Sequence, residues 1–259
     1  MFTIGVDVGG TYTDLVATDE TGRTVFAKSP STPADQSIGV MAGLEELARR
    51  LNVSRADMLA ATERLVHGTT VATNALLERK GAKVALLTTD GHRDVIEMRE
   101  GLKPDRYDLR SPPPEPLVPR ELRFGVRERL KANGEVLIPL DEASLDQAIA
   151  GIRKSGATSV AVCFLHSYLN PVHELAAVAR LARALPGISV SRSSDVLPQI
   201  KEYERVSTTI VNAYVEPIVR RYLTNLEARL KEAGFGKTLC ETGEIAPHDR
   251  LDIGVHDRG

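Results

Sequence analysis

The chain has 259 residues and a mass of 28.1 kDa, with 42% hydrophobic and 26% charged residues. That length fits one large domain or two small ones, and the composition is that of a folded globular protein, which excludes a short peptide and a globally disordered chain. The formal net charge of −2 supplies no broad basic face for a phosphate polymer, so we expect no nucleic-acid partner.

Cysteine content and hydropathy indicate the compartment. Two cysteines, Cys163 and Cys240, are too few for a disulfide framework or a four-ligand zinc site, which is typical of a reducing environment. No apolar run approaches the roughly 20 residues that cross a bilayer, and Met1 leads into a strand-like stretch instead of a signal peptide. We therefore expect a cytoplasmic protein with no membrane partner.

The first thirty residues predict three short strands. Apolar residues alternate with polar or small ones over residues 2–8, 12–18 and 24–28. The links between these strands are short enough to form an antiparallel meander.

Helical spacing follows the strands. Apolar residues recur at intervals of three and four positions: Ile38, Met41, Leu44, Leu47 and Leu51. A second helix is expected to open at Ser54, because Asp57 stands three residues further on, as in a capping box.

The middle of the chain alternates strands with helices, which is typical of α/β proteins. The expected elements are a strand ending at residues 65–67, a helix over 71–80 closed by Gly81, a buried strand over 83–88 and a short helix over 93–99.

Proline and glycine then mark two connections. The prolines of residues 111–119 exclude a helix and a central strand, so we expect an extended crossover there. Asn133 and Gly134 tolerate positive φ and predict a hairpin turn between strands over 124–130 and 135–140.

The last third predicts two further αβ units and a long helix. Its expected elements are a helix over 142–154, a strand over 159–165, a helix over 173–184, a strand over 188–192 and a helix over 202–233 that Pro217 kinks or splits. Residues 237–259 are polar and lack apolar periodicity, so we expect them to be poorly ordered. The chain as a whole predicts an α/β fold with an N-terminal antiparallel β-meander in a mixed sheet with flanking helices, further αβ units and a long C-terminal helix.

The link between the first two strands carries the clearest chemical signal, with the sequence Asp-Val-Gly-Gly-Thr-Tyr-Thr-Asp. Gly9 and Gly10 lack β-carbons, so the backbone can turn tightly and present amide donors to an anion, and the hydroxyls of Thr11 and Thr13 add donors. Asp7 would repel a bound triphosphate unless a divalent cation lay between them, which makes Asp7 the candidate metal ligand and Mg²⁺ the natural cation. A dinucleotide-binding loop is excluded, because a strand and not a helix follows the glycines.

The alternative is that Gly9 and Gly10 only form a tight turn that Asp7 caps. Placed between two N-terminal strands and followed by a third, however, the motif that ends at Asp14 resembles the first phosphate loop of the actin, sugar-kinase and heat-shock ATPase superfamily. This resemblance implies a phosphate site that includes Asp14, on a meander of that type.

A second polar loop lies between a predicted strand and a predicted helix, with the sequence His67-Gly68-Thr69-Thr70 and then Asn74 one turn further on. Free amides at a helix start, together with threonine hydroxyls, make a site for a carboxylate, a carbonyl oxygen or a phosphate. Thr69 or Thr70 equally fits a helix cap, and His67 equally fits a histidine satisfied in the core.

Four blocks in order carry a more specific resemblance: the N-terminal glycine loop, residues 67–81, residues 89–94 and residues 201–217. Together they resemble the hydantoinase/oxoprolinase family, specifically its A-type (N-methylhydantoinase A) subunit. The resemblance implies three parts: the family's N-terminal domain over residues 1–200, a long helix beginning the next domain over 201–236, and an atypical polar tail over 237–259.

The resemblance implies an activity, two cofactors and a set of site residues. Family members use ATP to open a cyclic amide such as a hydantoin or 5-oxoproline, or to carboxylate a ketone such as acetone or acetophenone. It implies ATP and Mg²⁺ as cofactors, with Asp7 and His67 in catalysis. The implied nucleotide and phosphate residues are Gly9, Gly10, Thr11, Thr13 and Asp14, and the implied substrate residues are Gly68, Thr69, Thr70 and Asn74.

The leading function is therefore a subunit of an ATP-dependent cyclic-amide hydrolase that acts through a phosphorylated intermediate. A subunit of an acetone- or acetophenone-type carboxylase, and a non-catalytic remnant that serves as an assembly partner, are the alternatives. Family chains continue into a second lobe with another phosphate loop and the adenosine pocket, so we expect this sequence to be truncated and to lack autonomous turnover. The expected partners are a small cyclic amide and a hydantoinase B-type subunit, in an oligomer.

Overall fold

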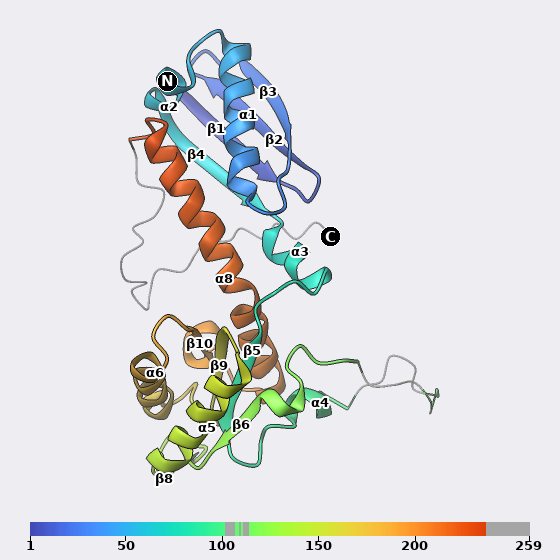
Figure 1. Cartoon of the computed structure of the whole chain (residues 1–259), viewed down its shortest axis with the longest axis vertical. Helices are drawn as coiled ribbons and strands as arrows, with labels where there is room; N and C mark the ends of the chain where they lie inside the picture. Colours follow the sequence, from blue (N-terminus) through green and yellow to red (C-terminus); the bar gives the residue numbers. More distant parts are fainter. Residues whose placement is uncertain (102–106, 109, 111–113, 237–259) are drawn as a thin grey trace.

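The computed structural model describes residues 1–101, 107–108, 110 and 114–236. The predicted tail over 237–259 and the first part of the proline-rich crossover lie outside these residues. The described chain forms two four-stranded sheets that lie toward opposite ends of one long helix, α8 (Glu202–Glu232) (Figure 1).

The first sheet has the strand order β3-β2-β1-β4. Its strands are β1 (Phe2–Val8), β2 (Tyr12–Asp19), β3 (Thr24–Pro30) and β4 (Thr62–Thr69). The first three strands pair antiparallel, and β4 lies parallel to β1. This arrangement confirms the predicted meander within a mixed sheet.

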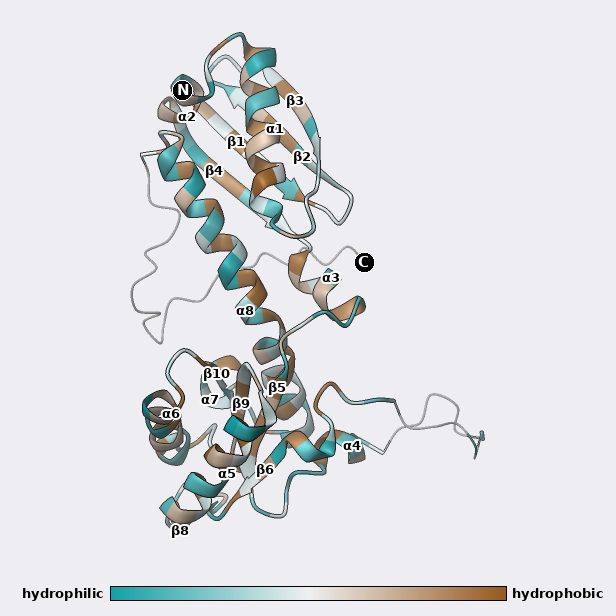
Figure 2. Cartoon of the chain, viewed as in Figure 1, coloured by the Kyte–Doolittle hydropathy of each residue, from teal (hydrophilic) through white to brown (hydrophobic). Residues whose placement is uncertain are grey.

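Helices α1 (Gln36–Leu51) and α2 (Arg55–Ala60) connect β3 to β4. A β-carbon at Gly43 would overlap the Leu15 side chain, so the glycine lets α1 lie directly on β2. Figure 2 shows α1 alternating between hydrophilic and hydrophobic residues, as expected of a helix with one buried face. The predicted cap of α2 is confirmed, because the Asp57 amide donates to Ser54 Oγ at 3.0 Å.

The second sheet is wholly parallel and has the order β10-β9-β5-β6. Its strands are β5 (Val84–Thr89), β6 (Arg123–Val126), β9 (Ser159–Cys163) and β10 (Ser189–Arg192). The other elements of this half are α4 (Val95–Met98), the 3-10 turn η1 (Arg120–Leu122), the hairpin β7 (Arg129–Leu130) and β8 (Val136–Ile138), α5 (Glu142–Ser155), α6 (Val172–Ala184) and α7 (Ser193–Val196). Every residue of β5 and β9 is buried, which explains why both strands are mostly apolar.

Apart from shifts of one or two residues at element ends, the structure departs from three of the predictions. The strand expected over 124–130 is divided, because its first half joins β5 in parallel and only its second half pairs with β8 across the turn at Gly134. Helix α3 (Val71–Leu77) ends before the predicted boundary, where Arg79 takes a positive φ of 52°. Helix α8 continues through Pro217 as one helix and is not split.

Helix α8 joins the two cores. Its residues Val206 and Ile210 pack with the second sheet, whereas Tyr222, Leu226 and Leu230 pack with the first sheet. Among the described residues no helix is both long and apolar enough to span a membrane.

Candidate phosphate site

The two predicted loops meet at one edge of the first sheet. β1 and β4 are parallel and pair Asp7 with Gly68 and Val8 with Thr69, so the chain leaves both strands at the same edge. The Thr70 amide and hydroxyl each lie 3.1 Å from the Val8 carbonyl oxygen, to which both donate. These bonds join the loop after β4 to the tip between β1 and β2.

The tip between β1 and β2 is closely packed at both of its glycines. The Gly9 amide donates to the Tyr12 carbonyl at 3.0 Å, and a β-carbon at Gly9 would lie only 2.9 Å from that oxygen. A β-carbon at Gly10 would lie 3.1 Å from Asn74 Nδ2, so the second loop closely approaches the tip. Within the described part of the chain, the amides of Gly10 and Thr11 have no hydrogen-bond acceptor. Two donors at the tip are therefore available to a ligand.

Thr13 supports the tip from the buried face. Its side chain is fully buried, and its hydroxyl lies 3.1 Å from Ser31 Oγ. Ser31 Oγ in turn donates to the Gly9 carbonyl at 2.7 Å. The structure thus places Thr13 beneath the loop and not among its exposed donors, and it adds Ser31, which no sequence pattern singled out.

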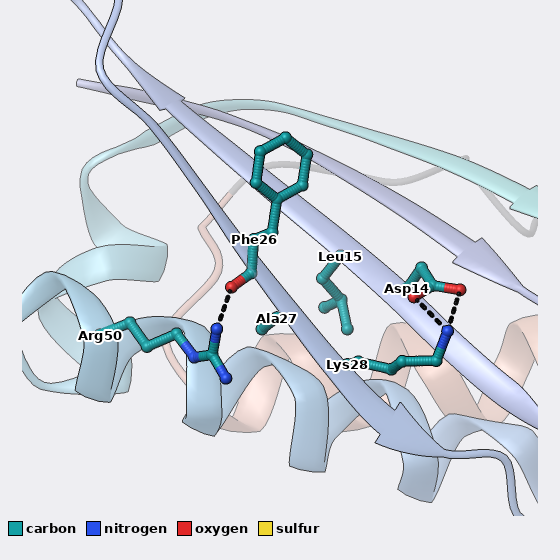
Figure 3. A pocket seen from close by; sticks show the side chains of 6 residues that line it. All are labelled: Asp14, Leu15, Phe26, Ala27, Lys28 and Arg50. Atoms are coloured by element: carbon teal, nitrogen blue, oxygen red, sulfur yellow. Dashed lines mark hydrogen bonds and ion pairs between the residues drawn. The ribbon is translucent and has the colours of Figure 1, made fainter.

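The two predicted aspartates lie side by side on the exposed face of the sheet. Asp7 and Asp14 are register partners across β1 and β2. Asp14 is ion-paired with Lys28 on β3 at 3.0 Å, and the Lys28 ammonium lies 5.0 Å from the centre of the Tyr12 ring. Figure 3 shows this pair in a shallow hollow beside Phe26, whose ring points away from α1. Asp7 has no hydrogen bond or ion pair with any described residue, so of the two aspartates its carboxylate is the one available to bind a ligand.

His67 faces the opposite side of the sheet and hydrogen-bonds to the Tyr222 hydroxyl on α8. Burial lowers the pKa of His67, an effect that the nearby Asp7 charge partly opposes, and burial raises the pKa of Tyr222. Both groups are thus neutral near pH 7, and either can donate in this hydrogen bond, depending on which ring nitrogen of His67 carries the proton. Tyr222 packs with the first core and also fixes the orientation of His67.

The remaining polar residues of the second loop bind to the chain itself. The Val71 amide donates to Thr69 Oγ1 at 3.1 Å, whereas the cap position of α3 is Thr70, whose side chain makes no cap hydrogen bond. Asn74 Nδ2 donates to Thr70 Oγ1 at 3.1 Å, which orients the amide beside Gly10. Gly68 lies beside Asp7, whose Oδ1 stands 3.6 Å from the point that a β-carbon at residue 68 would occupy, an ordinary contact distance.

These residues fit a metal-chelated polyphosphate. Two free amides and one free carboxylate stand together at an exposed edge, where the amides would bind phosphate oxygens and Asp7 would hold a Mg²⁺ ion that the phosphates also ligate. No group of three or more histidine, cysteine, aspartate or glutamate side chains in the described ranges is placed to hold a metal by itself. A cation here would therefore need oxygens from the ligand or from water in addition to Asp7.

Comparison with known proteins identifies relatives of this arrangement. The sequence model of the hydantoinase/oxoprolinase N-terminal region matches residues 3–185. Caprolactamase subunit alpha of Pseudomonas jessenii is 43% identical over 235 residues, which are 90% of this chain and 34% of that protein. The crystal structure of ATP-dependent caprolactamase from Pseudomonas jessenii aligns over the same shares of the two chains with a TM-score of 0.82. The nucleotide-free structure of acetone carboxylase, 31% identical, aligns over 90% of this chain and 34% of that chain with a TM-score of 0.81. The chain therefore spans about a third of the relatives that it matches.

Proposed function

The chain belongs to the hydantoinase/oxoprolinase family. We propose that it forms the phosphate-binding part of an ATP-dependent hydrolase subunit that opens a cyclic amide of the hydantoin or 5-oxoproline type. The reaction would pass through a phosphorylated intermediate. ATP and Mg²⁺ would be its cofactors, and a B-type subunit its partner in an oligomer. The names of two relatives, ATP-dependent caprolactamase and caprolactamase subunit alpha, support ATP use and assembly into a larger enzyme.

One observation carries the proposal, namely the juxtaposition of the free Asp7 carboxylate with the unbonded amides of Gly10 and Thr11. A carboxylate without a partner next to free amide donors suits a ligand that carries both a cation and anionic oxygens. The Asp14–Lys28 ion pair would set the charge beside the site, and Thr13 would support the tip through its hydrogen bond with Ser31.

His67 would work on the substrate side of the loop. Tyr222 occupies its Nε2 in a hydrogen bond, which leaves Nδ1 as the ring nitrogen that would contact the substrate. Asn74, held beside Gly10 by Thr70, would add a second polar contact to substrate or phosphate. ATP supplies a phosphoryl group that turns the oxygen of an unreactive amide carbonyl into a leaving group. The protein's contribution is then positioning and charge neutralisation.

A carboxylase subunit is the second candidate, and the similarity to acetone carboxylase favours it. The same loop would then serve to phosphorylate the enolate oxygen of a ketone. An assembly partner without catalysis is the third candidate, in which the tip would be only a tight turn.

Substrate-stimulated ATP hydrolysis separates these candidates. The assembled enzyme that contains this chain and its B-type partner is assayed for phosphate release with hydantoin, with 5-oxoproline, and with acetone plus bicarbonate. We expect stimulation by the cyclic amides. Stimulation by ketone and bicarbonate alone would identify a carboxylase, and an ATP hydrolysis rate unchanged by every substrate would contradict both enzymatic functions.

A further inference from the structure

Helix α8 contacts the first half of the chain at a second polar point, besides the bond between Tyr222 and His67. Tyr222, Asn225 and Arg229 lie three and four positions apart, so their side chains share one face of the helix. Asn225 Nδ2 and Arg229 Nη2 both donate to Asp35 Oδ2, at 3.3 and 3.2 Å. The proposed function uses neither Asp35 nor these two donors.

Asp35 connects α8 to the start of α1. It is the N-cap of α1, and its other carboxylate oxygen, Oδ1, accepts hydrogen bonds from the amide and the hydroxyl of Ser37. Arg229 Nε in turn donates to Ser37 Oγ at 3.0 Å, so the guanidinium contacts both residues of the cap. Burial raises the pKa of Asp35, but the hydrogen bonds from Ser37 and Arg229 outweigh it and lower the pKa overall, so the carboxylate is ionised near pH 7. Only 19% of the Asp35 side chain is exposed, so water does little to replace a lost partner.

The residues before Asp35 form a closed turn. The Asp35 amide donates to the Thr32 carbonyl at 3.0 Å, and the Thr32 hydroxyl donates to the Asp35 carbonyl at 2.6 Å. The Gly39 amide donates to the same hydroxyl at 3.1 Å, which ties the turn to α1. A displacement of Asp35 would therefore move the whole turn.

Ser31 connects this turn to the glycine tip. Its amide donates to the Thr11 carbonyl at 2.9 Å, and its hydroxyl donates to the Gly9 carbonyl at 2.7 Å. The Gly9 carbonyl and the Gly10 amide belong to one planar peptide group, so the bond to the carbonyl sets the direction of the amide. Because the Gly10 amide is one of the two donors proposed to bind phosphate oxygens, Ser31 orients a donor of the candidate site.

We propose that Asp35 is a positioning residue of the candidate phosphate site, through which Arg229 and Asn225 of α8 hold the glycine tip. The inference rests on the proposed function for the ligand that the tip binds, but the tie itself is defined by the hydrogen bonds. Together with the bond between Tyr222 and His67, it makes one face of α8 the support of both loops of the site. The other end of α8 packs with the second sheet, so the same helix sets the tip in relation to that half of the chain.

Substitutions at both ends of the tie test the proposal in the full 259-residue chain. Asp35→Asn removes the carboxylate that pairs with Arg229 but keeps the start of α1, because asparagine caps helices as well as aspartate does. Arg229→Gln removes the same pair from the α8 side, and Arg229→Lys serves if that variant does not fold. Asp141→Asn is a control that changes the N-cap of α5 in the same way, and Arg220→Gln is a control that removes an α8 charge paired only within that helix.

The first readout is the backbone ¹⁵N–¹H NMR signals of Gly10 and Thr11 without ligand. We expect Asp35→Asn and Arg229→Gln to shift these signals in the same direction, because each breaks the same tie, and the two control variants to leave them in place. Shifts of opposite sign would report only the direct fields of two opposite charges, and they would overturn the positioning role. Unshifted signals would overturn it as well.

The second readout is the binding of magnesium-ATP, followed by the same two signals. Asp35→Asn and Arg229→Gln should each weaken binding about three- to tenfold, which corresponds to the loss of one net hydrogen bond, and the double variant should weaken it no further than either single change. Equal affinity of Asp35→Asn and the wild type would overturn the role of Asp35 in the site. If the wild type does not bind magnesium-ATP, the proposed function fails, and the ligand-free signals alone decide whether Asp35 positions the tip.

Discussion

Replacement of Tyr222 by phenylalanine tests the contact between α8 and the candidate site. The change removes one hydroxyl that hydrogen-bonds to His67 and keeps the ring that packs with the first core. A net hydrogen bond contributes about 0.5–1.5 kcal/mol, and a half-buried imidazole nitrogen left unpaired raises the loss toward about 1–3 kcal/mol. We therefore expect the free energy of unfolding to fall by about 1–2 kcal/mol.

Urea denaturation of four proteins measures this interaction directly: wild type, Tyr222→Phe, His67→Leu and the double variant. In the double-mutant cycle Tyr222→Phe should cost less than about 0.5 kcal/mol once His67 is absent. Tyr214→Phe is the matched control, since Tyr214 lies buried on the same helix but its hydroxyl has no hydrogen-bond partner in the described structure. The hydrogen bond between His67 and Tyr222 would be refuted if the losses of unfolding free energy from His67→Leu and Tyr222→Phe were additive. It would also be refuted if Tyr222→Phe and Tyr214→Phe lowered the free energy of unfolding equally.

Two further predictions concern stability. Burial, and after it Arg129, lower the pKa of His92 in the folded chain, whereas the unfolded chain has the ordinary value of about 6.5. The unfolded state therefore binds more protons as the pH falls below about 6.5, so the free energy of unfolding should fall between pH 6.5 and pH 5. His92→Gln should make this slope shallower, and an unchanged slope in urea titrations would contradict the assignment. Gly43→Ala should destabilise the fold by about 1–3 kcal/mol in the same assay, because its β-carbon would overlap buried Leu15, whereas Gly236→Ala meets open space and should be neutral within about 0.5 kcal/mol. Equal effects of the two alanines would show that α1 is not held against β2 by close contact at Gly43.

Local patterns predicted most of the elements, because their causes act over a few residues. The α2 cap depends on Ser54 and Asp57 alone, and the hairpin turn depends on Gly134 at φ 85°. The extent of the strand after residue 123 could not be predicted in this way. Its division depends on β5, a partner that lies more than thirty residues earlier in the chain.

The sequence predicted the backbone turn of the candidate site, but it predicted the positions of only some of the side chains. A double glycine between strands indicates a tip with free amides, and the structure has such a tip at Gly10. Which face each side chain takes depends on register, which places Thr13 beneath the tip and pairs Asp14 with Lys28. Tyr222 could not be found from sequence, since it lies 155 positions from His67 and looks like any packing residue of a helix.

ATP hydrolysis by the assembled enzyme carrying Asp7→Asn tests the central claim most directly. The substitution removes the free carboxylate and keeps the side-chain shape, so the rate should fall at least tenfold, about 1.4 kcal/mol of transition-state stabilisation, while assembly is unchanged. Asp19→Asn removes the same charge at the β2–β3 turn, on the far edge of the sheet, and should leave the rate unchanged. Full activity of Asp7→Asn, or an equal loss of ATP hydrolysis rate from Asp19→Asn, would contradict the claim that the glycine tip and Asp7 bind a metal-bound polyphosphate.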